Sequence, residues 1–242
     1  MSLKLGSTSI GSLYLGSTKI AEAYLGSTKV YGSAPPVDPY NPYGLPANTM
    51  RVKLAAGKDP SGQYWVSQSS LVDATENIWD ITVAYGFAYI SYGFSSMSPI
   101  EIIGANTSGV TNFSYMCEGC TTLTSVALFD TRSATDMSMM FKGCSSLTAL
   151  PLFSTGSVTT MDLMCYECSA LTAIPLFDTS SVTNMNQTFY WCRNVEHGAL
   201  ALYQQASSQS VPPAQHSGTF RDCGDNTATG QAELAQIPSD WK

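Results

Sequence analysis

The chain has 242 residues, of which 44% are hydrophobic and only 12% charged, and its formal net charge is -7. This length and hydrophobic content exclude a disordered chain and allow one large domain or two small ones. The sequence has no cluster of Lys or Arg, so we expect neither nucleic acid nor an anionic membrane surface as a partner. Because about a quarter of the residues of an average soluble protein are charged, we expect a surface made largely of Ser, Thr, Asn, Gly and Tyr.

The first residues, MSLKLGSTSIGSLYLGS, lack the basic segment and the uninterrupted apolar run of a Sec signal peptide. The sequence also has no apolar run of 18 residues, so no membrane insertion is expected. If the chain is complete, it leaves the cell by a route other than Sec or stays inside. If it has been trimmed, the missing signal has no meaning.

Residues 1–33 repeat a phrase of ten residues: LKLGSTSIGS, LYLGSTKIAE and AYLGSTKVYG. Gly-Ser-Thr favours a turn, and the β-branched and aromatic residues between the turns favour strands, so a small β-repeat module is predicted. So few strands are marginally stable alone in water. The module is therefore expected to dock on a neighbour, on another copy of itself or on a larger assembly. The alternative is a plain N-terminal sheet of the domain that follows.

Residues 34–48 form a proline-rich segment that would disrupt a helix or a central strand, and they are predicted to be a semi-rigid linker. Residues 49–96 contain MRVKLAAG, QYWVS and WDITVAYGFAYISY, in which strand-forming residues cluster between Gly, Pro and Asp/Ser breaks. A mostly β section is expected there. We interpret it as an N-terminal cap for the repeats that follow.

A second repeat, with a period of 24 residues, runs through residues 97–196. Its recurring positions are Cys120, Cys144, Cys168 and Cys192; Leu123, Leu147, Leu171 and Val195; Val126, Leu150 and Ile174; Phe129, Phe153 and Phe177; Thr131, Thr155 and Thr179; Ala134, Val158 and Val182; and Met137, Met161 and Met185. A unit of this size is too short to bury its own apolar positions. Stacking such units side by side would make their core continuous, which predicts a repeat architecture.

The phrases CSSLTALPLFSTGSVTTMDLM and CSALTAIPLFDTSSVTNMNQTF resemble the BspA-like leucine-rich repeats of bacterial surface proteins, in the variant with a phrase close to FDTSNVTNMSYMFYGCSSL. The resemblance covers about two-fifths of the chain and implies a right-handed solenoid with one short parallel strand per turn, at LTSVAL, LTALPL and LTAIPL. Cys117 and Cys165 depart from the family phrase, which has Phe at their positions. The fold class expected is therefore mainly β with short helices: a right-handed leucine-rich-repeat solenoid with parallel strands, preceded by the β-repeat module and closed by a C-terminal cap helix.

Residues 197–242 are predicted to be that C-terminal cap. EHGALALYQQASSQ, at 196–209, has helix formers at helical spacing and is followed by the breaker VPPAQHSG. The end of the chain, GTFRDCGDNTATGQAELAQIPSDWK, and the YLGSTK phrase near its start are similar to segments of gut Bacteroides proteins and of their phages. This second resemblance rests on short segments without recognisable chemistry.

Two C-x-x-C pairs, Cys117 with Cys120 and Cys165 with Cys168, raise the question of a metal or redox site. The pairs are two repeats apart, or about 10 Å at the spacing of stacked strands, so one zinc ion would not reach both. Phe141 and Phe189 replace the first cysteine in the alternate units, which is typical of an apolar core position. We therefore predict core packing and no metal. Disulfides between neighbouring repeats, such as Cys120 to Cys144, stay open, although seven cysteines leave at least one unpaired.

The rest of the sequence favours no catalytic site and no cofactor. The two histidines, His197 and His216, both lie in the tail and outside any metal-binding or catalytic motif. The segment from Asp222 to Asp225 resembles a calcium loop but lacks its residue order, so a turn is expected. The chain is predicted not to be an enzyme.

The positions that vary between the repeats suggest a recognition surface. Tyr166, Tyr190, Trp191 and Arg193 fall on neighbouring lines near the C-terminal end of the repeats, and aromatic and Arg side chains are typical anchors for protein or glycan contacts. The alternative is that these side chains cover the cap helix. We predict a module for recognition and adhesion that binds a protein or carbohydrate ligand on a cell.

The expected location is the cell surface, the extracellular space or a virion. The sequence favours a component of a phage or prophage tail, because no signal peptide is visible and because the two chain ends resemble phage-associated segments. The alternative is an exported adhesin on the surface of a gut commensal bacterium.

Overall fold

The computed structural model describes residues 14–15, 18–19, 23–25, 28–31, 38, 40–64, 66–84, 86–88 and 91–242. The chain divides into two compact units, residues 1–39 and 40–242. In the first unit β1 (Tyr14–Leu15) pairs with β2 (Thr18–Lys19), and β3 (Ala23–Leu25) pairs with β4 (Thr28–Tyr31), all antiparallel. The second and third copies of the ten-residue phrase thus each form a two-stranded ribbon. The first copy, LKLGSTSIGS, lies outside the described residues.

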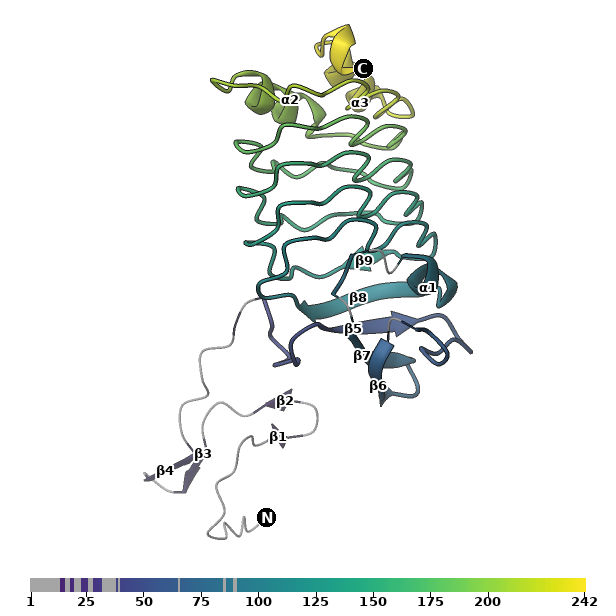
Figure 1. The fold of residues 1–242 in the computed structure, drawn as a ribbon, viewed down its shortest axis with the longest axis vertical. Helices are drawn as coiled ribbons and strands as arrows, with labels where there is room; N and C mark the ends of the chain where they lie inside the picture. The colour runs from purple at the N-terminus through teal and green to yellow at the C-terminus, as the bar shows by residue number, and fades with distance from the viewer. Residues whose placement is uncertain are drawn as a thin grey trace. The chain divides into compact units, whose positions relative to one another are not determined.

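The second unit begins with a mixed five-stranded sheet (Figure 1). Its strands are β5 (Thr49–Leu54), β6 (Val66–Asp73), β7 (Ile78–Val83), β8 (Pro99–Asn106) and β9 (Ser125–Val126), in the order β6-β7-β5-β8-β9. The first four are antiparallel and β9 joins β8 in parallel. A short helix, α1 (Ser91–Ser96), lies between β7 and β8 in the sequence. The sheet is open, and β6 forms one of its edges.

Alternation along β5 and β7 gives the sheet a buried and an open face. Met50, Val52 and Leu54 are buried on β5, whereas the intervening Arg51 and Lys53 are only half-buried. Because successive side chains of a strand point to opposite faces, the apolar face packs on the core and the other carries the polar groups.

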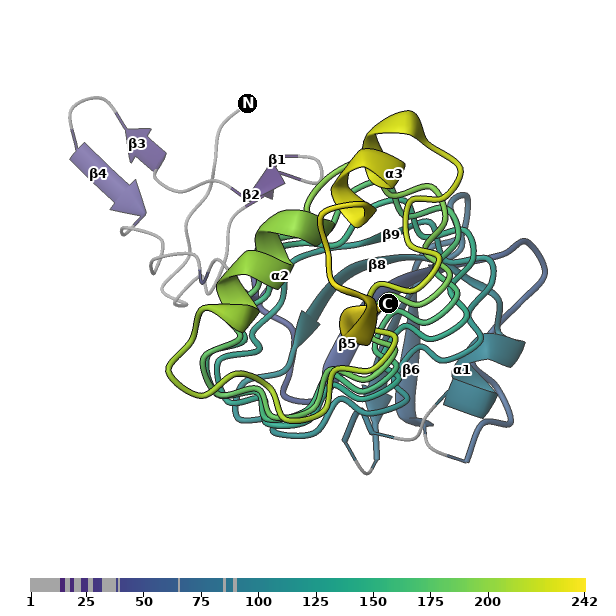
Figure 2. The same ribbon diagram turned by 90° about the horizontal axis from the view of Figure 1, so that it is seen from above.

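Beyond the sheet, the 24-residue repeats lie one on the next, and the chain traces nearly superimposed loops when viewed along the stack (Figures 1 and 2). Backbone hydrogen bonds join residues of neighbouring units: the N–H of Cys117 donates to the O of Met140 at 2.8 Å, that of Phe141 to Met164 at 2.8 Å and that of Cys165 to Thr188 at 2.8 Å. We call residues 107–196, together with 215–223, the repeat stack. All the recurring apolar positions predicted from the sequence are buried inside it.

Threonine side chains add hydrogen bonds along the outside of the repeat stack. The Oγ1 atoms of Thr135, Thr159 and Thr183 each donate to the carbonyl of the threonine one repeat earlier, at 3.2, 3.0 and 3.1 Å. Inside the stack, Thr131 and Thr155 bond carbonyls of the next repeat. On the outside, the carbonyls of Thr111, Thr135 and Thr159 thus accept both the N–H and the hydroxyl of the threonine one repeat later.

The fold class predicted from the sequence, a right-handed leucine-rich-repeat solenoid with parallel strands, is wrong for this chain. Among the described residues the largest sheet is the open mixed sheet, and within the repeat stack only Ser125–Val126 is a strand. The segments LTALPL and LTAIPL are not strands, and the units meet at single parallel bridges such as Asp136 with Thr160.

Proline explains the difference between the repeats. The N–H of Ala127 donates to the O of Ile102 at 2.8 Å, directly after β9. Its equivalents in the next two repeats are Pro151 and Pro175, which have no N–H to donate. The short strand that forms in the first of these segments is therefore not extended through the others.

The tail contains a further tier of the repeat stack. Helix α2 (Ala199–Ser207) is followed by residues 215–223, whose carbonyls accept hydrogen bonds from the preceding repeat: Phe189 N–H to Thr219 O at 2.9 Å and Trp191 N–H to Arg221 O at 3.0 Å. Helix α3 (Ala228–Leu234) and the 3-10 turn η1 (Ser239–Trp241) complete the chain. Thr227 caps α3 by accepting the N–H of Gly230 at 2.9 Å.

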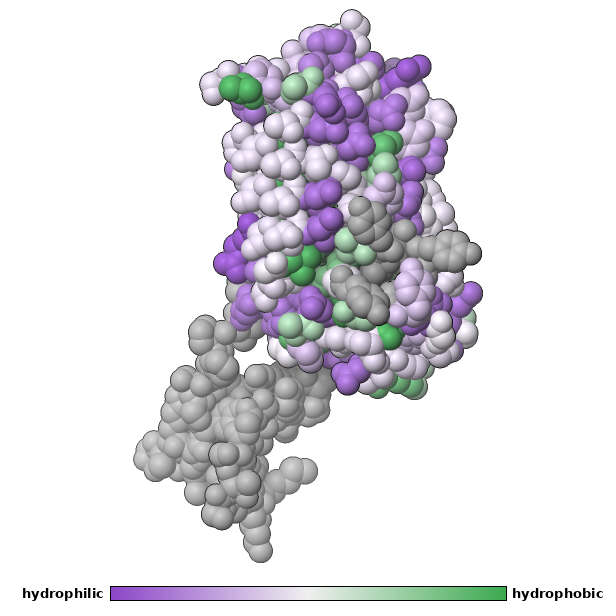
Figure 3. Space-filling view, viewed as in Figure 1, coloured by the Kyte–Doolittle hydropathy of each residue, from purple (hydrophilic) through white to green (hydrophobic). Residues whose placement is uncertain are grey.

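The visible face of the second unit is mostly of intermediate or hydrophilic residues, with few strongly hydrophobic areas (Figure 3). This agrees with the low charge content of the sequence, because the exposed positions are mainly small polar residues. In the part of the chain that the structure describes, no helix has the length and apolar character needed to cross a membrane.

Candidate functional site: an aromatic and arginine cluster

The four residues selected from the sequence come together at the end of the repeat stack. The rings of Tyr166 and Tyr190 stack at a centroid distance of 5.1 Å, with an interplanar angle of 15°. Trp191 lies 5.2 Å from Tyr190 and 6.0 Å from Tyr166, tilted against both. Cζ of Arg193 lies 5.4 Å from the centroid of the Trp191 ring. The repeat produces this arrangement, because the same position of successive units falls on one line along the stack. We call these four residues the aromatic cluster.

Residues 215–223, the tail tier, supply two further residues that contact the aromatic cluster and that the sequence analysis did not select. Cζ of Arg221 lies 5.6 Å from the Tyr190 ring centroid, and Nε1 of Trp191 donates to Oδ2 of Asp222 at 2.8 Å. The signal that identifies this tier is the phrase T-F-x-x-C, which occurs as TFYWC at 188–192 and as TFRDC at 219–223. The two copies of this phrase are 31 residues apart. A search for residues that recur every 24 positions therefore does not find the second copy.

The aromatic cluster borders an open hollow of about 300 Å³. The hollow is lined by Thr121, Gly143, Ser145, Glu167, Ser169, Trp191 and Arg193. Two of these side chains carry opposite charges, three carry hydroxyls, and Trp191 supplies a large apolar surface. Partial burial, followed by the nearby Glu167 carboxylate, raises the pKa of Tyr166, so its hydroxyl keeps its proton at neutral pH and is able to donate a hydrogen bond. The arrangement offers one aromatic wall, a cation, an anion and hydroxyl groups to a ligand.

Trp191 occupies a backbone position that earlier repeats fill with glycine. Gly119 and Gly143 have φ of +73° and +74° there, while Glu167 and Trp191 have φ of +62° and +61°. The left-handed region costs an L-residue other than glycine about 1 kcal/mol or more, and it is unusual for a bulky side chain. The last two repeats thus have Glu167 and Trp191, at the edge of the hollow, where earlier repeats have glycine, the residue with least strain in this conformation.

The seven cysteines are free thiols, and all are buried. The thiol of Cys144 donates to the O of Cys117, that of Cys168 to Phe141 and that of Cys192 to Cys165, each at 3.1 Å. Burial raises the pKa of Cys117, Cys144, Cys165 and Cys192 well above the usual range of a thiol. The prediction that these cysteines pack in the core is confirmed. No group of three or more His, Cys, Asp or Glu suited to a metal ion occurs among the residues that the structure describes.

Histidine takes part in packing at the end of the tail. The ring of His216 stacks on Trp241 at 4.3 Å, Nδ1 lies 2.9 Å from the carbonyl O of Pro213, and Nε2 lies 3.3 Å from Oδ2 of Asp240. These contacts join the tail tier to η1. His197 is exposed, and its carbonyl accepts the N–H of Ile174 at 3.0 Å.

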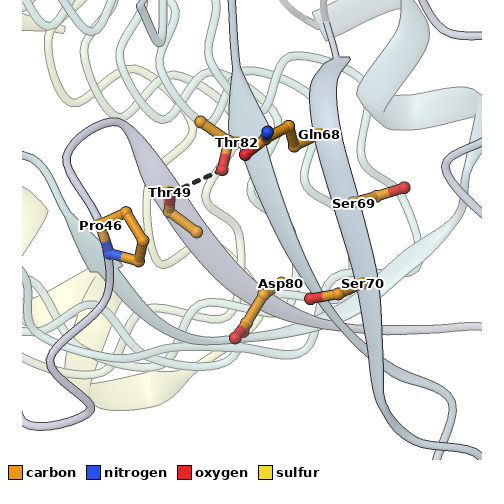
Figure 4. Close-up of a pocket in the computed structure, with 7 residues that line it drawn as sticks. All are labelled: Pro46, Thr49, Gln68, Ser69, Ser70, Asp80 and Thr82. Atoms are coloured by element: carbon orange, nitrogen blue, oxygen red, sulfur yellow. Dashed lines mark hydrogen bonds between the residues drawn. The ribbon is translucent and has the colours of Figure 1, made fainter.

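A second hollow, of about 450 Å³, lies on the open face of the sheet and was not predicted. Figure 4 shows its lining of Pro46, Thr49, Gln68, Ser69, Ser70, Asp80 and Thr82, with the hydroxyls of Thr49 and Thr82 joined at 2.8 Å. Asp80 accepts two hydrogen bonds from Arg51, at 2.7 and 2.8 Å. The alternating patterns MRVKL and WDITV place these polar side chains on one face, but the pairing of β5 with β7 cannot be read from either segment alone.

Comparison with known protein families gives a match for one region of the chain. Residues 88–201 match the family model described as Mycoplasma protein of unknown function, DUF285. This span is a little under half of the chain and includes Tyr166, Tyr190, Trp191 and Arg193, but it ends before Arg221 and Asp222. No curated protein and no solved structure matches the chain. The tail tier that completes the aromatic cluster thus lies outside the matched region.

Proposed function

We propose that this chain is a recognition module, without catalytic activity, that binds a protein or carbohydrate ligand on a cell surface through the aromatic cluster. The observation that carries the proposal is Trp191, a bulky side chain in a left-handed backbone conformation beside an open hollow. The repeat backbone enforces this conformation, because the same position is left-handed in each unit, and the last unit fills it with Trp instead of glycine.

The composition of the aromatic cluster supports recognition. Trp, Tyr and Arg are the residues most enriched among the anchors of binding interfaces. Their contacts with one another hold the rings in place, so little side-chain entropy is lost when a ligand binds. Glu167, Ser145 and Ser169 at the hollow are able to orient a polar ligand by hydrogen bonds.

The resemblance to BspA-like leucine-rich repeats of bacterial surface proteins supports a location outside the cell. The resembling residues, 97–196, fall within the span matched by the DUF285 model, 88–201. We place the chain on a cell surface, in the extracellular space or on a virion. A phage or prophage tail component is preferred, and an exported adhesin of a gut commensal is the alternative. Genes for tail proteins next to the coding sequence would favour the first, and an export signal or lipobox upstream would exclude it.

Binding is tested by applying the purified chain to glycan arrays, to immobilised matrix proteins and to intact bacterial cells. We expect retention on at least one of the three surfaces, and a weaker signal for Arg193→Ala, because this change removes the cation at the hollow and leaves the buried core untouched. Absence of binding to all three surfaces contradicts the proposed function. Equal binding by Arg193→Ala and the unmodified chain contradicts the proposed site.

A further inference from the structure

Strand β6 is an edge strand whose central stretch, Gln68–Leu71, lacks the usual protection of an edge. Seven of its eight residues, VSQSSLVD, are exposed, and Leu71 and Val72 are 47% and 45% exposed. Edge strands in natural proteins are normally kept short, are interrupted by β-bulges, or carry Lys, Pro or inward-pointing charges that prevent pairing with another chain. The pairing of β6 is irregular toward both ends but not in its central stretch. β6 is as long as any strand in the described part of the chain and carries one charged residue, Asp73, at its end.

The central part of β6 is regular enough to accept a further strand. Its pairing with β7 shifts register between Val66 and Gln68 and again between Leu71 and Asp73, while Gln68–Leu71 pairs without interruption with Trp79–Thr82. Figure 4 shows Gln68 and Ser70 on the side of the hollow and Ser69 pointing away from it, as expected for regular alternation along this stretch. Alternate backbone N–H and C=O groups of this stretch point away from β7, toward the open edge.

We infer that two copies of this chain associate by antiparallel pairing of β6 with β6, which joins the two five-stranded sheets across a two-fold axis. A two-fold axis perpendicular to the sheet requires that residues of the same face lie opposite each other. Centred on Ser70, the pairing places Ser70 opposite its own copy, Ser69 opposite Leu71, and Gln68 opposite Val72. Leu71 of each copy, within the regular stretch, then lies beside Ser69 of the partner strand.

Charge favours a second copy as the occupant of this edge. In the register centred on Ser70, Asp73 lies opposite Ser67, so no two like charges meet across the axis. Like charges directly opposite each other destabilise a strand pair, and apolar and hydroxyl pairs stabilise it. A closed two-fold pairing uses the same surface on both copies and leaves no open edge for further growth. The interface is small, so a weak dimer that depends on concentration is expected.

The chain offers a direct test of this register, because its seven native cysteines are buried and only an engineered thiol is accessible. Ser70→Cys places two thiols opposite each other at the axis, and we expect a covalent dimer of the full chain under mild oxidation. Ser67→Cys is the matched control on the same strand: its two copies lie six residues apart along the pair, or about 20 Å. Cross-linking at neither position, or equally at both, overturns the inference.

Charge reversal provides the second measurement. Sedimentation velocity of the full chain over a range of concentrations is expected to show a monomer and a dimer. Ser70→Lys and Ser70→Glu should each weaken the dimer by about tenfold, because two like charges then meet at the axis. An equimolar mixture of the two variants should restore it. A chain that is monomeric at every concentration, or a dimer that persists equally in both single variants, contradicts the pairing; the second result would be expected if the chain associated through residues 1–33.

Discussion

Phe220 tests whether the tail forms a true tier of the repeat stack. Its side chain is fully buried and stacks between Phe189, at a centroid distance of 6.1 Å, and Trp241, at 6.3 Å. Its N–H also donates to the O of Trp241 at 2.9 Å. A residue with these contacts belongs to the core, although it lies outside the regular period.

The change Phe220→Ala is expected to lower the free energy of unfolding by about 3 to 5 kcal/mol, the usual cost of truncating a buried Phe to Ala. At about 2 to 4 °C per kcal/mol for a domain of this size, the melting temperature should fall by roughly 6 to 20 °C. Urea denaturation followed by circular dichroism measures the first quantity, and calorimetry measures the second.

Arg221→Ala is the matched control for this prediction. The Arg221 side chain is 60% exposed and contacts the Tyr190 ring and, at 4.0 Å, the Asp222 carboxylate, so a loss of about 1 kcal/mol or less is expected. If Phe220→Ala costs no more than Arg221→Ala, the tail does not complete the core, and the description of residues 215–223 as part of the repeat stack fails.

Three further predictions concern stability. Burial raises the pKa of five thiols, so the unfolded chain releases protons from them at lower pH than the folded chain. Their contribution to the free energy of unfolding should be constant between about pH 7 and 8 and fall as the pH rises through the usual thiol range, near 8.5 to 9, in a pH series under reducing conditions. A flat profile up to pH 10 would contradict their burial. Glu167→Gly should stabilise the chain by about 1 kcal/mol in urea denaturation, because glycine adopts its φ of +62° without strain, and a loss of stability would refute this. Thr188→Val should cost about 1 kcal/mol by the same assay, since the buried hydroxyl bonds the carbonyls of Met161 and Met185; no change would show that these bonds contribute nothing.

The sequence predicts the buried positions of the repeats better than their backbone. Cysteine, leucine, phenylalanine and methionine recur every 24 residues because they meet the same neighbours in successive units, so their burial follows from the spacing. Strand pairing depends instead on a backbone donor at each position. Pro151 and Pro175 have no N–H and therefore remove that donor. The strands implied by the resemblance to leucine-rich repeats include both prolines, which is why that prediction was wrong.

The site was predicted only in part for a related reason. Tyr166, Tyr190, Trp191 and Arg193 share the regular register, so the sequence places them together. Arg221 and Asp222 contact the aromatic cluster but follow α2 in the sequence. The helix and its connections lengthen the last unit, so these two residues do not follow the 24-residue period. The left-handed conformation of Trp191 was not predicted, although Gly119 and Gly143 occupy the same position of earlier repeats.

The most direct test of the proposed recognition site compares two changes to glycine. Trp191→Gly removes the aromatic wall of the hollow, while Met139→Gly makes the same kind of change at another left-handed residue, with φ of +57°, that does not line the hollow. Both are measured as titrations on the glycan, matrix protein or bacterial cells that retain the unmodified chain. We predict that Trp191→Gly weakens binding by about 30-fold or more, as expected for an anchor worth about 2 kcal/mol, and that Met139→Gly changes it by less than about threefold. Equal affinities for the two variants would contradict the assignment of this hollow as the binding site.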